Sequence, residues 1–359
     1  MTALTPLDDV VHARCARWEG VGLPFSFMDV ITSRAPAPGE VLVRVDLATV
    51  CGSDLHTVTG RRPSPVPALL GHEQVGTVVG VGGGDPRCVD GRPVVPGMRV
   101  VWSVTAACGA CDRCLRGMTQ KCRVLRKYGH EPWDENAPLT GGFATHCVLL
   151  PGTAVVAVPD RLPDAVASPA SCATATVAAA LDAAGALEGR RLLVSGVGML
   201  GLTAVAMARE AGCHVIAVDP EPARRAQALR FGAAEVRDAG PVPEDVDVAL
   251  ELSGHPEGVR TCLRALAVGG TAVLVGSVAP GEPVALDPES VVRGLHSLVG
   301  VHNYRAEHLQ AAVDFLAARH DAYPFAELVG GTYPLEALDE AVAAARSAVA
   351  PRQAILPSR

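Results

Sequence analysis

RLLVSGVGMLG, the stretch from Arg191 to Gly201, joins a short apolar run to a Gly-x-Gly-x-x-Gly turn. We expect the run to form a buried strand and the residues after the turn to begin a helix. The next apolar run, 214–218, is followed by Asp219, which stands 18 positions after Gly201. A glycine triplet between a strand and a helix, with an acidic residue about 20 positions further on, is typical of a βαβ unit that binds a dinucleotide.

Each glycine of this turn has a physical task in that interpretation. Gly196 permits the tight turn, Gly198 lets the backbone approach a pyrophosphate, and Gly201 lets the helix pack closely on the strand. Met199 and Leu200 lie in this turn, just before the helix expected at 202–210, whose free N–H groups and positive dipole end favour phosphate. The turn is therefore the expected cofactor site.

The residues that follow the turn indicate which nicotinamide cofactor binds. The carboxylate of Asp219 can accept hydrogen bonds from both hydroxyls of an adenosine ribose, and it would repel a 2′-phosphate. We therefore expect NAD rather than NADP. Arg224 and Arg225 keep NADP open, because a nearby guanidinium could accommodate the extra phosphate, although both could equally form a solvated helix surface.

The surrounding patterns predict an α/β protein with two domains. Apolar runs alternate with helical patterns between residues 191 and 275, which predicts a doubly wound parallel sheet. Earlier residues show short β-rich runs between Pro and Gly, such as 41–48, and predict a smaller β-rich domain. We expect the β-rich domain at 1–165, the dinucleotide-binding domain at 166–300 and a return to the first domain at 301–359.

Four cysteines in a C-x2-C-x2-C-x7-C spacing predict a metal site. Their thiolates are close enough in sequence to converge on one tetrahedral zinc ion, and such a closed four-thiolate site is structural. Disulfides or core cysteines are the alternatives, but four cysteines within fifteen residues of a chain without a secretory signal favour metal. The four residues are Cys108, Cys111, Cys114 and Cys122.

Composition excludes several classes of function. The 359 residues carry a net charge of −7, whereas a nucleic-acid surface needs concentrated Lys and Arg. No apolar run reaches the ~18 residues of a membrane helix, and the N-terminus has no signal-peptide pattern. We therefore expect a cytoplasmic protein with reduced thiols that binds neither nucleic acid nor membrane.

The motifs together resemble a known family over nearly the whole chain. Cys51-Gly-Ser-Asp-Leu-His56, Gly71-His-Glu73, the four-cysteine lobe and the 196–201 turn with Asp219 are similar to zinc-containing alcohol dehydrogenases of the medium-chain dehydrogenase/reductase superfamily. The resemblance implies a GroES-like catalytic domain and a Rossmann domain, two zinc ions per chain, a small alcohol or aldehyde substrate, and a homodimer or homotetramer.

The resemblance also implies a catalytic zinc site. Its ligands would be Cys51, His72 and Cys172, a Cys2His set that leaves the fourth position to water or substrate. Glu73 matches an acidic neighbour that could act as a near-metal carboxylate or a transient ligand. Cys172 by itself could equally be a small buried hydrophobe.

The same motif supplies residues for orientation and proton transfer. Asp54 would accept a hydrogen bond from the second ring nitrogen of His72 and so orient its imidazole. Zinc lowers the pKa of a bound alcohol, and the released proton would pass through Ser53 to His56.

Further cofactor contacts are expected in four places. By resemblance, Thr176 would pack against the nicotinamide. Val275 and Gly276 stand at the carboxyl end of a predicted strand, where doubly wound sheets contact their cofactors. Arg352 would bind the pyrophosphate, or would be an exposed arginine without such a role.

Substrate identity is indicated by a loop that, by resemblance, borders the substrate cleft. Arg62 stands in this loop, and its guanidinium would suit an anionic alcohol or aldehyde, although Arg61 and Arg62 could both face water. Trp102 is a second candidate substrate contact. The run 51–63, together with Lys127-Tyr-Gly-His130, resembles a bacterial subgroup associated with phosphonate metabolism, which implies a hydroxyalkyl phosphonate as one possible substrate.

Two other functions stay open on the sequence. One is an NADP-dependent aldehyde reductase or polyol dehydrogenase of the same superfamily. The other is a protein that binds zinc and nucleotide without turnover, against which stand Ser53 and His56, since a binding module has no use for a proton path.

Overall fold

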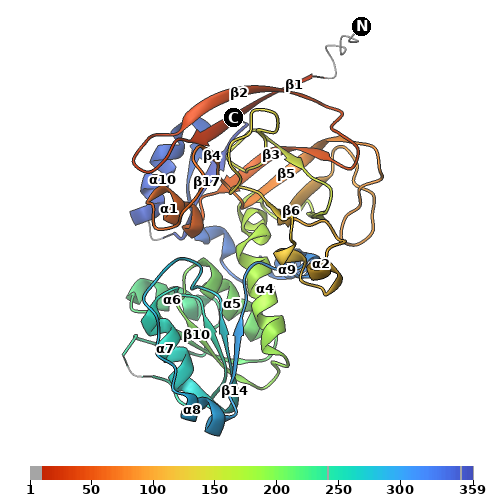
Figure 1. The fold of residues 1–359 in the computed structure, drawn as a ribbon. Helices are drawn as coiled ribbons and strands as arrows, with labels where there is room; N and C mark the ends of the chain where they lie inside the picture. The colour runs from red at the N-terminus through yellow and green to blue at the C-terminus, as the bar shows by residue number, and fades with distance from the viewer. Residues whose placement is uncertain (1–9, 241, 348–349, 359) are drawn as a thin grey trace. The chain divides into compact units, whose positions relative to one another are not determined.

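The computed structural model describes residues 10–240, 242–347 and 350–358, which form two compact units (Figure 1). Unit 1 comprises the chain up to Cys172 together with Arg305–Ala318 and the segment from Phe325 onward, and unit 2 comprises Ala173–Tyr304 and Arg319–Pro324. The boundaries expected at residues 165 and 300 precede those at which the chain changes unit. The short return of 319–324 to unit 2 was not expected from the sequence.

Unit 2 is built on a sheet of six parallel strands in the order β12-β11-β10-β13-β14-β15. The central strand β10 is buried along nearly its whole length, as parallel strands covered on both faces are. Its neighbours are β11 on one side and β13 on the other, so the strand order reverses at β10 and leaves a ligand crevice at its carboxyl end. The predicted α/β fold class is confirmed.

The strands and helices of unit 2 have the following bounds: α4 (Ala173–Ala184), β10 (Arg191–Ser195), α5 (Met199–Glu210), β11 (His214–Val218), α6 (Pro222–Arg230), β12 (Glu235–Arg237), β13 (Val246–Glu251), α7 (Pro256–Ala265), β14 (Leu266–Leu274), α8 (Pro288–Gly294) and β15 (Ser297–Gly300).

Unit 1 is β-rich, and its main sheet has eight strands. The order β16-β17-β3-β5-β6-β7 is extended by β8, which pairs with β3, and by β9, which pairs with β6. The pairs are antiparallel except for β16 with β17. A separate three-stranded sheet has the order β2-β1-β4. The last strand, β17, pairs with β3, so the end of the chain lies in unit 1.

The elements of unit 1 have the following bounds: β1 (Val10–Trp18), β2 (Ser26–Ser33), β3 (Val41–Thr49), α1 (Gly52–Val58), β4 (Ala68–Leu69), β5 (Gln74–Val81), β6 (Arg99–Ala106), α2 (Asp112–Leu115), η2 (Thr119–Lys121), β7 (Arg126–Lys127), β8 (His146–Leu149), β9 (Thr153–Ala157), α3 (Asp164–Ala167), η3 (Ser168–Ser171), α9 (Ala306–Arg319, whose last residue falls in unit 2), η4 (Phe325–Leu328), β16 (Val329–Pro334), η5 (Leu335–Ala337), α10 (Leu338–Ser347) and β17 (Arg352–Leu356).

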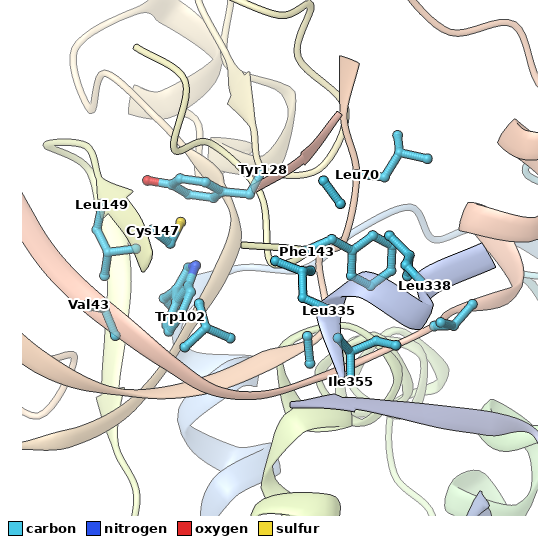
Figure 2. Packing of buried hydrophobic residues seen from close by; sticks show 14 of the residues in the cluster. Val43, Leu70, Trp102, Tyr128, Phe143, Cys147, Leu149, Leu335, Leu338 and Ile355 are labelled. Atoms are coloured by element: carbon cyan, nitrogen blue, oxygen red, sulfur yellow. The ribbon is translucent and has the colours of Figure 1, made fainter. Parts of the chain in front are cut away.

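Trp102 lies in the hydrophobic core of unit 1 and not on a surface that a substrate could reach. Its side chain comes from β6, has no accessible surface, and packs in a cluster with Val43, Cys147 and Leu149 (Figure 2). The expectation that Trp102 contacts substrate is therefore corrected. An aromatic side chain on a strand buried along most of its length fills the core, because neither face of the strand meets solvent.

No helix in the described part of the chain is long and apolar enough to cross a membrane.

Replacing Trp102 should test its place in the core. Trp102→Ala would remove a fully buried aromatic side chain and is expected to lower the free energy of unfolding by about 3–5 kcal/mol. Ile31→Ala is the matched control, because Ile31 is 71% exposed and its loss should change stability by about 0.5 kcal/mol or less. Denaturant unfolding followed by circular dichroism measures both, and equal effects of the two substitutions would contradict the assignment.

Candidate metal and cofactor sites

Cys51, His72 and Cys172 bring one donor atom each to a common point in unit 1. The two sulfurs and one ring nitrogen lie within 4.8 Å of one another. Cys51 follows β3 and His72 precedes β5, and these strands pair with Ala48 opposite Gln74, so the antiparallel register brings the two residues together. Cys172 lies between η3 and α4.

Hydrogen bonds from η3 hold Cys172 beside His72. The hydroxyl of Ser168 donates to the carbonyl of Glu73 at 3.0 Å, and the hydroxyl of Ser171 lies 3.3 Å from the carbonyl of His72 and from the amide nitrogen of Gln74. Both serines are fully buried, and their polar groups are satisfied by a backbone segment that precedes them by about a hundred residues. The third donor is thus positioned through its neighbours in sequence.

The imidazole of His72 has a polar side chain near each nitrogen, although only Nε2 forms a hydrogen bond among the described residues. Nε2 lies 2.9 Å from the hydroxyl of Ser53, and Nδ1 lies 3.4 Å from a carboxylate oxygen of Asp54. Asp54 is fully buried and also accepts from the backbone of Cys51 at 2.8 Å and of Gly71 at 3.4 Å, which fixes the carboxylate at the start of α1. Burial lowers the pKa of His72, but the charges of Asp54 and Cys51 outweigh burial and raise it to about 10.

Glu73 and Arg352 form a buried ion pair beside Cys51. The guanidinium donates to both carboxylate oxygens, with distances of 2.6 and 2.7 Å, and to the sulfur of Cys51 at 3.3 Å. Thr49 donates to the same carboxylate at 2.8 Å. The alternative that Arg352 is exposed is wrong, since only 4% of it is accessible. The carboxylate of Glu73 is not among the converging donors of the described residues.

The donor set fits a zinc ion. The pKa of the Cys51 thiol is held well below its usual range, chiefly by the hydrogen bond from the Cys172 thiol and also by the charges of Arg352 and His72. A thiolate is the form that binds metal. Two sulfurs and one imidazole nitrogen are the ligands of a catalytic zinc site that keeps a fourth position open.

The four cysteines of the lobe also converge. Their sulfurs lie within 4.8 Å of one another, with 3.5 Å between Cys111 and Cys114 and 3.5 Å between Cys108 and Cys122. All four thiols are free, so the disulfide alternative is wrong. Backbone N–H groups, first that of Arg123, lower the pKa of Cys111 to about 6, which suits a thiolate ligand. The set matches a closed structural zinc site.

In unit 2, the strand register places the glycine turn beside Asp219. Ser195 is paired with Val218, so Gly196 and Asp219 leave adjacent strands at the same edge of the sheet. The carboxylate of Asp219 accepts a hydrogen bond from the backbone of Val197 at 2.9 Å. Gly196 has a φ of +89°, which glycine adopts without strain.

Gly201, the third glycine of the motif, lies in close contact with the backbone of the turn that precedes it. A Cβ atom on Gly201 would collide with the carbonyl oxygen of Gly196, so only glycine lets the helix start so near the strand. Gly198 has open space at the Cβ position and is the N-cap of α5, which begins at Met199 and continues with Leu200. The N–H groups of this first turn are available to an anion.

A cavity of about 430 Å³ opens at this edge. Gly196, Gly198 and Asp219 line it, and so does Arg224, whose guanidinium is 3.8 Å from the Asp219 carboxylate. The cavity is large enough for part of a dinucleotide, since small-molecule sites span roughly 300–1,000 Å³. Arg224 thus lies where a 2′-phosphate would be recognised, which keeps NADP open.

Three other expected cofactor contacts lie elsewhere in unit 2. The backbone N–H groups of Val275 and Gly276 donate to the carbonyl of Glu251 at 3.1 and 2.9 Å, which ties the loop after β14 to the end of β13. Thr176 is buried in α4. None of the three lines the cavity, and their contacts with cofactor stay predictions.

Two residues near the metal donors were read from the sequence only as part of a subgroup signature. The ring of His130 lies 4.9 Å from that of His72, and burial lowers the pKa of Lys127 to about 8. Lys127 stands directly before the buried Tyr128, and His130 stands two positions after it. A lysine and a histidine close to a tyrosine were the available signal, but nothing in the sequence tells which segment lies next to the metal donors.

Comparisons with known proteins agree with this geometry. The family model for the alcohol dehydrogenase GroES-like domain matches residues 37–160, and the model for zinc-binding dehydrogenases matches residues 199–318. The 5-exo-hydroxycamphor dehydrogenase of Pseudomonas putida is 30% identical over 336 residues, covering 86% of this chain and 89% of that protein. An L-threonine 3-dehydrogenase of Anaeromyxobacter sp. strain Fw109-5 is 34% identical over 285 residues, covering 73% and 77%.

Solved structures share the fold over nearly the full chain. An alcohol dehydrogenase from Thermotoga maritima has a TM-score of 0.90 and 26% identity, covering 97% of this chain and 100% of that one. A Sinorhizobium meliloti chain described as a zinc-binding dehydrogenase and bound to NADP has a TM-score of 0.82 and 27% identity, covering 97% and 100%. Nothing in these comparisons supports membership of a phosphonate-associated subgroup.

Metal content should report on both donor sets. The wild-type chain is expected to hold two zinc ions, and Cys172→Ala one, because two remaining donors bind zinc weakly while the four-cysteine lobe is untouched. Cys213→Ala removes a buried cysteine of unit 2 outside both sets and should keep two. Elemental analysis after gel filtration measures the ratio, and two zinc ions in Cys172→Ala would contradict the assignment of Cys172 as a ligand.

Proposed function

The chain belongs to the zinc-containing alcohol dehydrogenases of the medium-chain dehydrogenase/reductase superfamily, and from this premise we propose that it oxidises a primary or secondary alcohol with NAD. It is an oxidoreductase that acts on CH–OH donors. The observation that carries the proposal is the convergence of Cys51, His72 and Cys172 on one point. A three-ligand set leaves room for a substrate oxygen, whereas a closed set does not.

The residues of unit 1 have separate tasks in this reaction. Cys51, His72 and Cys172 would hold zinc, and the bound metal would act as a Lewis acid while NAD accepts the hydride. Asp54 holds the imidazole of His72 from its second nitrogen, which orients the ring toward the metal position. Glu73 neutralises Arg352, so a guanidinium can remain buried against the Cys51 sulfur and stabilise its thiolate.

Ser53 and His56 are proposed to carry the proton away. The two residues are three positions apart on α1 and therefore share one face of the helix. The Ser53 hydroxyl is 2.9 Å from the nitrogen of His72 that would face the metal. Burial, together with the charge of Arg61, lowers the pKa of His56 below 6.5, so its imidazole is neutral at pH 7 and can accept a proton.

The preference for NAD rests on Asp219. Its carboxylate lines the cavity of unit 2 and would repel a 2′-phosphate. NADP is the second candidate, favoured by Arg224 at the same cavity and by the Sinorhizobium meliloti relative bound to NADP. With NADP the chain would work as an aldehyde reductase or a polyol dehydrogenase.

The assembly of the protein is proposed to be a homodimer or homotetramer. Exposed apolar side chains lie on the preceding helix α8 and directly after it, where Val292 and Leu295 are each 70% exposed, and Leu298 of the edge strand β15 is 38% exposed. Exposed apolar side chains at a sheet edge are suited to pairing with a second chain.

Removal of the Ser53 hydroxyl should slow turnover without loss of metal. Ser53→Ala is expected to lower kcat by about 10²–10⁴-fold, the range over which positioned proton transfer contributes to rate. Thr59→Ala, which removes a hydroxyl at the exposed end of the same helix, should leave kcat unchanged. Steady-state NADH formation measures kcat, and an unchanged rate in Ser53→Ala with full zinc content would refute the proton path.

A change at Asp219 should shift cofactor preference. Asp219→Asn keeps an acceptor for the backbone of Val197 but loses the charge that repels a 2′-phosphate. The ratio of kcat/KM for NAD to that for NADP is expected to fall about tenfold or more, which corresponds to roughly 1.4 kcal/mol. Asp238→Asn, an exposed acid on the same side of the sheet, is the control. A wild-type enzyme that prefers NADP would favour the second candidate.

A further inference from the structure

We propose that Lys127 and Arg62 bind an anionic group of the substrate, so that the substrate is an alcohol or aldehyde carrying a carboxylate, phosphate or phosphonate. This inference rests on the proposed function, because it names the substrate class of the same site. It adds Lys127 to the arginine that the sequence pointed to.

Lys127 is a half-buried lysine without a counter-ion. It lies in β7, where its register partner is Thr105 of β6. The nearby acid, Glu131, binds the backbone N–H of Lys127 at 2.7 Å and directs its other oxygen to Arg126 at 2.7 Å. Among the residues that the structure describes, no carboxylate lies within ion-pair distance of the Lys127 ammonium. A charge removed from water in this way needs a partner.

The charges around Lys127 show where that partner would lie. Burial and the charge of Arg62 lower the pKa of Lys127 to about 8, whereas the thiols of Cys172 and Cys51 raise it. Geometry places the metal ligands nearby as well, because the backbone N–H of His130 donates to the carbonyl of Lys127 at 3.2 Å and the His130 ring lies 4.9 Å from that of His72. A divalent zinc ion would neutralise those two thiolates, which would leave the ammonium and the guanidinium without compensation.

Arg62 is the second basic residue of the proposed site, and it is linked to α1, the helix that carries Ser53 and His56. It follows α1, its backbone N–H donates to the carbonyl of His56 at 3.0 Å, and its side chain is half-buried. Its charge lowers the pKa of His56, Lys127 and His130. No ion pair of Arg62 is found in the described ranges, although most arginines of this chain that lie in unit 1 have one. A guanidinium and an ammonium together are a common recognition set for carboxylate and phosphate oxygens.

His130 is an independent sign of an absent ligand. Its Nδ1 atom is buried and has no hydrogen-bond partner in the described structure. Its ring lies 4.9 Å from that of His72, measured between ring centroids. An imidazole nitrogen can donate or accept one hydrogen bond, and a buried polar atom without a partner is uncommon in a folded protein. A substrate oxygen near Lys127 would satisfy it.

Matched substrates and variants test the inference on the zinc-loaded full chain. The substrates are three ω-hydroxyalkyl compounds of one chain length, ending in carboxylate, phosphate or phosphonate, and the neutral diol of the same length. Lys127→Met and Arg62→Gln remove one charge each, and Arg61→Gln is the control, since Arg61 is exposed on the same loop. Metal content and unfolding midpoint verify that each variant is folded.

The wild-type enzyme is expected to prefer one of the three anions over the diol. Each charge removal should lower kcat/KM for that anion by about 10–100-fold, mostly through KM, because a charge-assisted hydrogen bond is lost. The diol and the Arg61→Gln control should be unaffected. The preferred compound shows whether the site recognises a carboxylate, a phosphate or a phosphonate. A preference for phosphonate would support the resemblance to the phosphonate-associated subgroup.

Calorimetry separates the failure of this inference from failure of the proposed function. The probes are propanoate, propyl phosphate and propylphosphonate, none of which can be oxidised at a CH–OH group. Binding of one anion that is lost in Lys127→Met and Arg62→Gln supports the inference even if no alcohol is turned over. Turnover of the diol with equal kcat/KM in all variants, and no anion binding, would overturn the inference and leave the proposed function intact.

Discussion

The hydrogen bonds between η3 and the start of β5 are the constraint on which the metal site depends. Ser168 and Ser171 are bonded to the backbone of residues 72–74, and the sequence separations of 95 and 99 residues show how distant the two segments are along the chain. Cys172 follows directly after η3. Its sulfur reaches the donors of Cys51 and His72 because the hydroxyls of the buried serines bond η3 to the backbone that carries His72.

A second constraint is the balance of buried charge around these donors. Asp54, Glu73 and Arg352 are all nearly inaccessible, and each is held by at least two polar contacts. Buried charges persist only when they are paired and hydrogen-bonded. Among the described residues, neither Lys127 nor Arg62 has an ion-pair partner. This difference supports the proposal that the two side chains bind an anionic group of the substrate.

Some residues could not be assigned correctly from the sequence. Trp102 was expected to meet substrate, yet β6 is buried along nearly its whole length, which no local pattern reveals. The ion pair of Arg352 with Glu73 joins residues 279 positions apart and depends on the pairing of β17 with β3. Such contacts follow from strand order and register, and neither can be read from a single segment.

The sequence by itself determined the parts whose chemistry is local. The glycine turn with Asp219 and the four-cysteine lobe are each contained in fewer than thirty consecutive residues, so spacing alone predicts which atoms converge. The family resemblance named Cys172 as the third ligand, and the tertiary structure shows its sulfur beside Cys51 and His72. Only the tertiary structure decided that Arg352 is buried and that no carboxylate of the described residues forms an ion pair with Lys127. The physical reason is that burial and long-range pairing arise when distant strands and helices pack together, and each side chain's neighbours are then set by the whole fold.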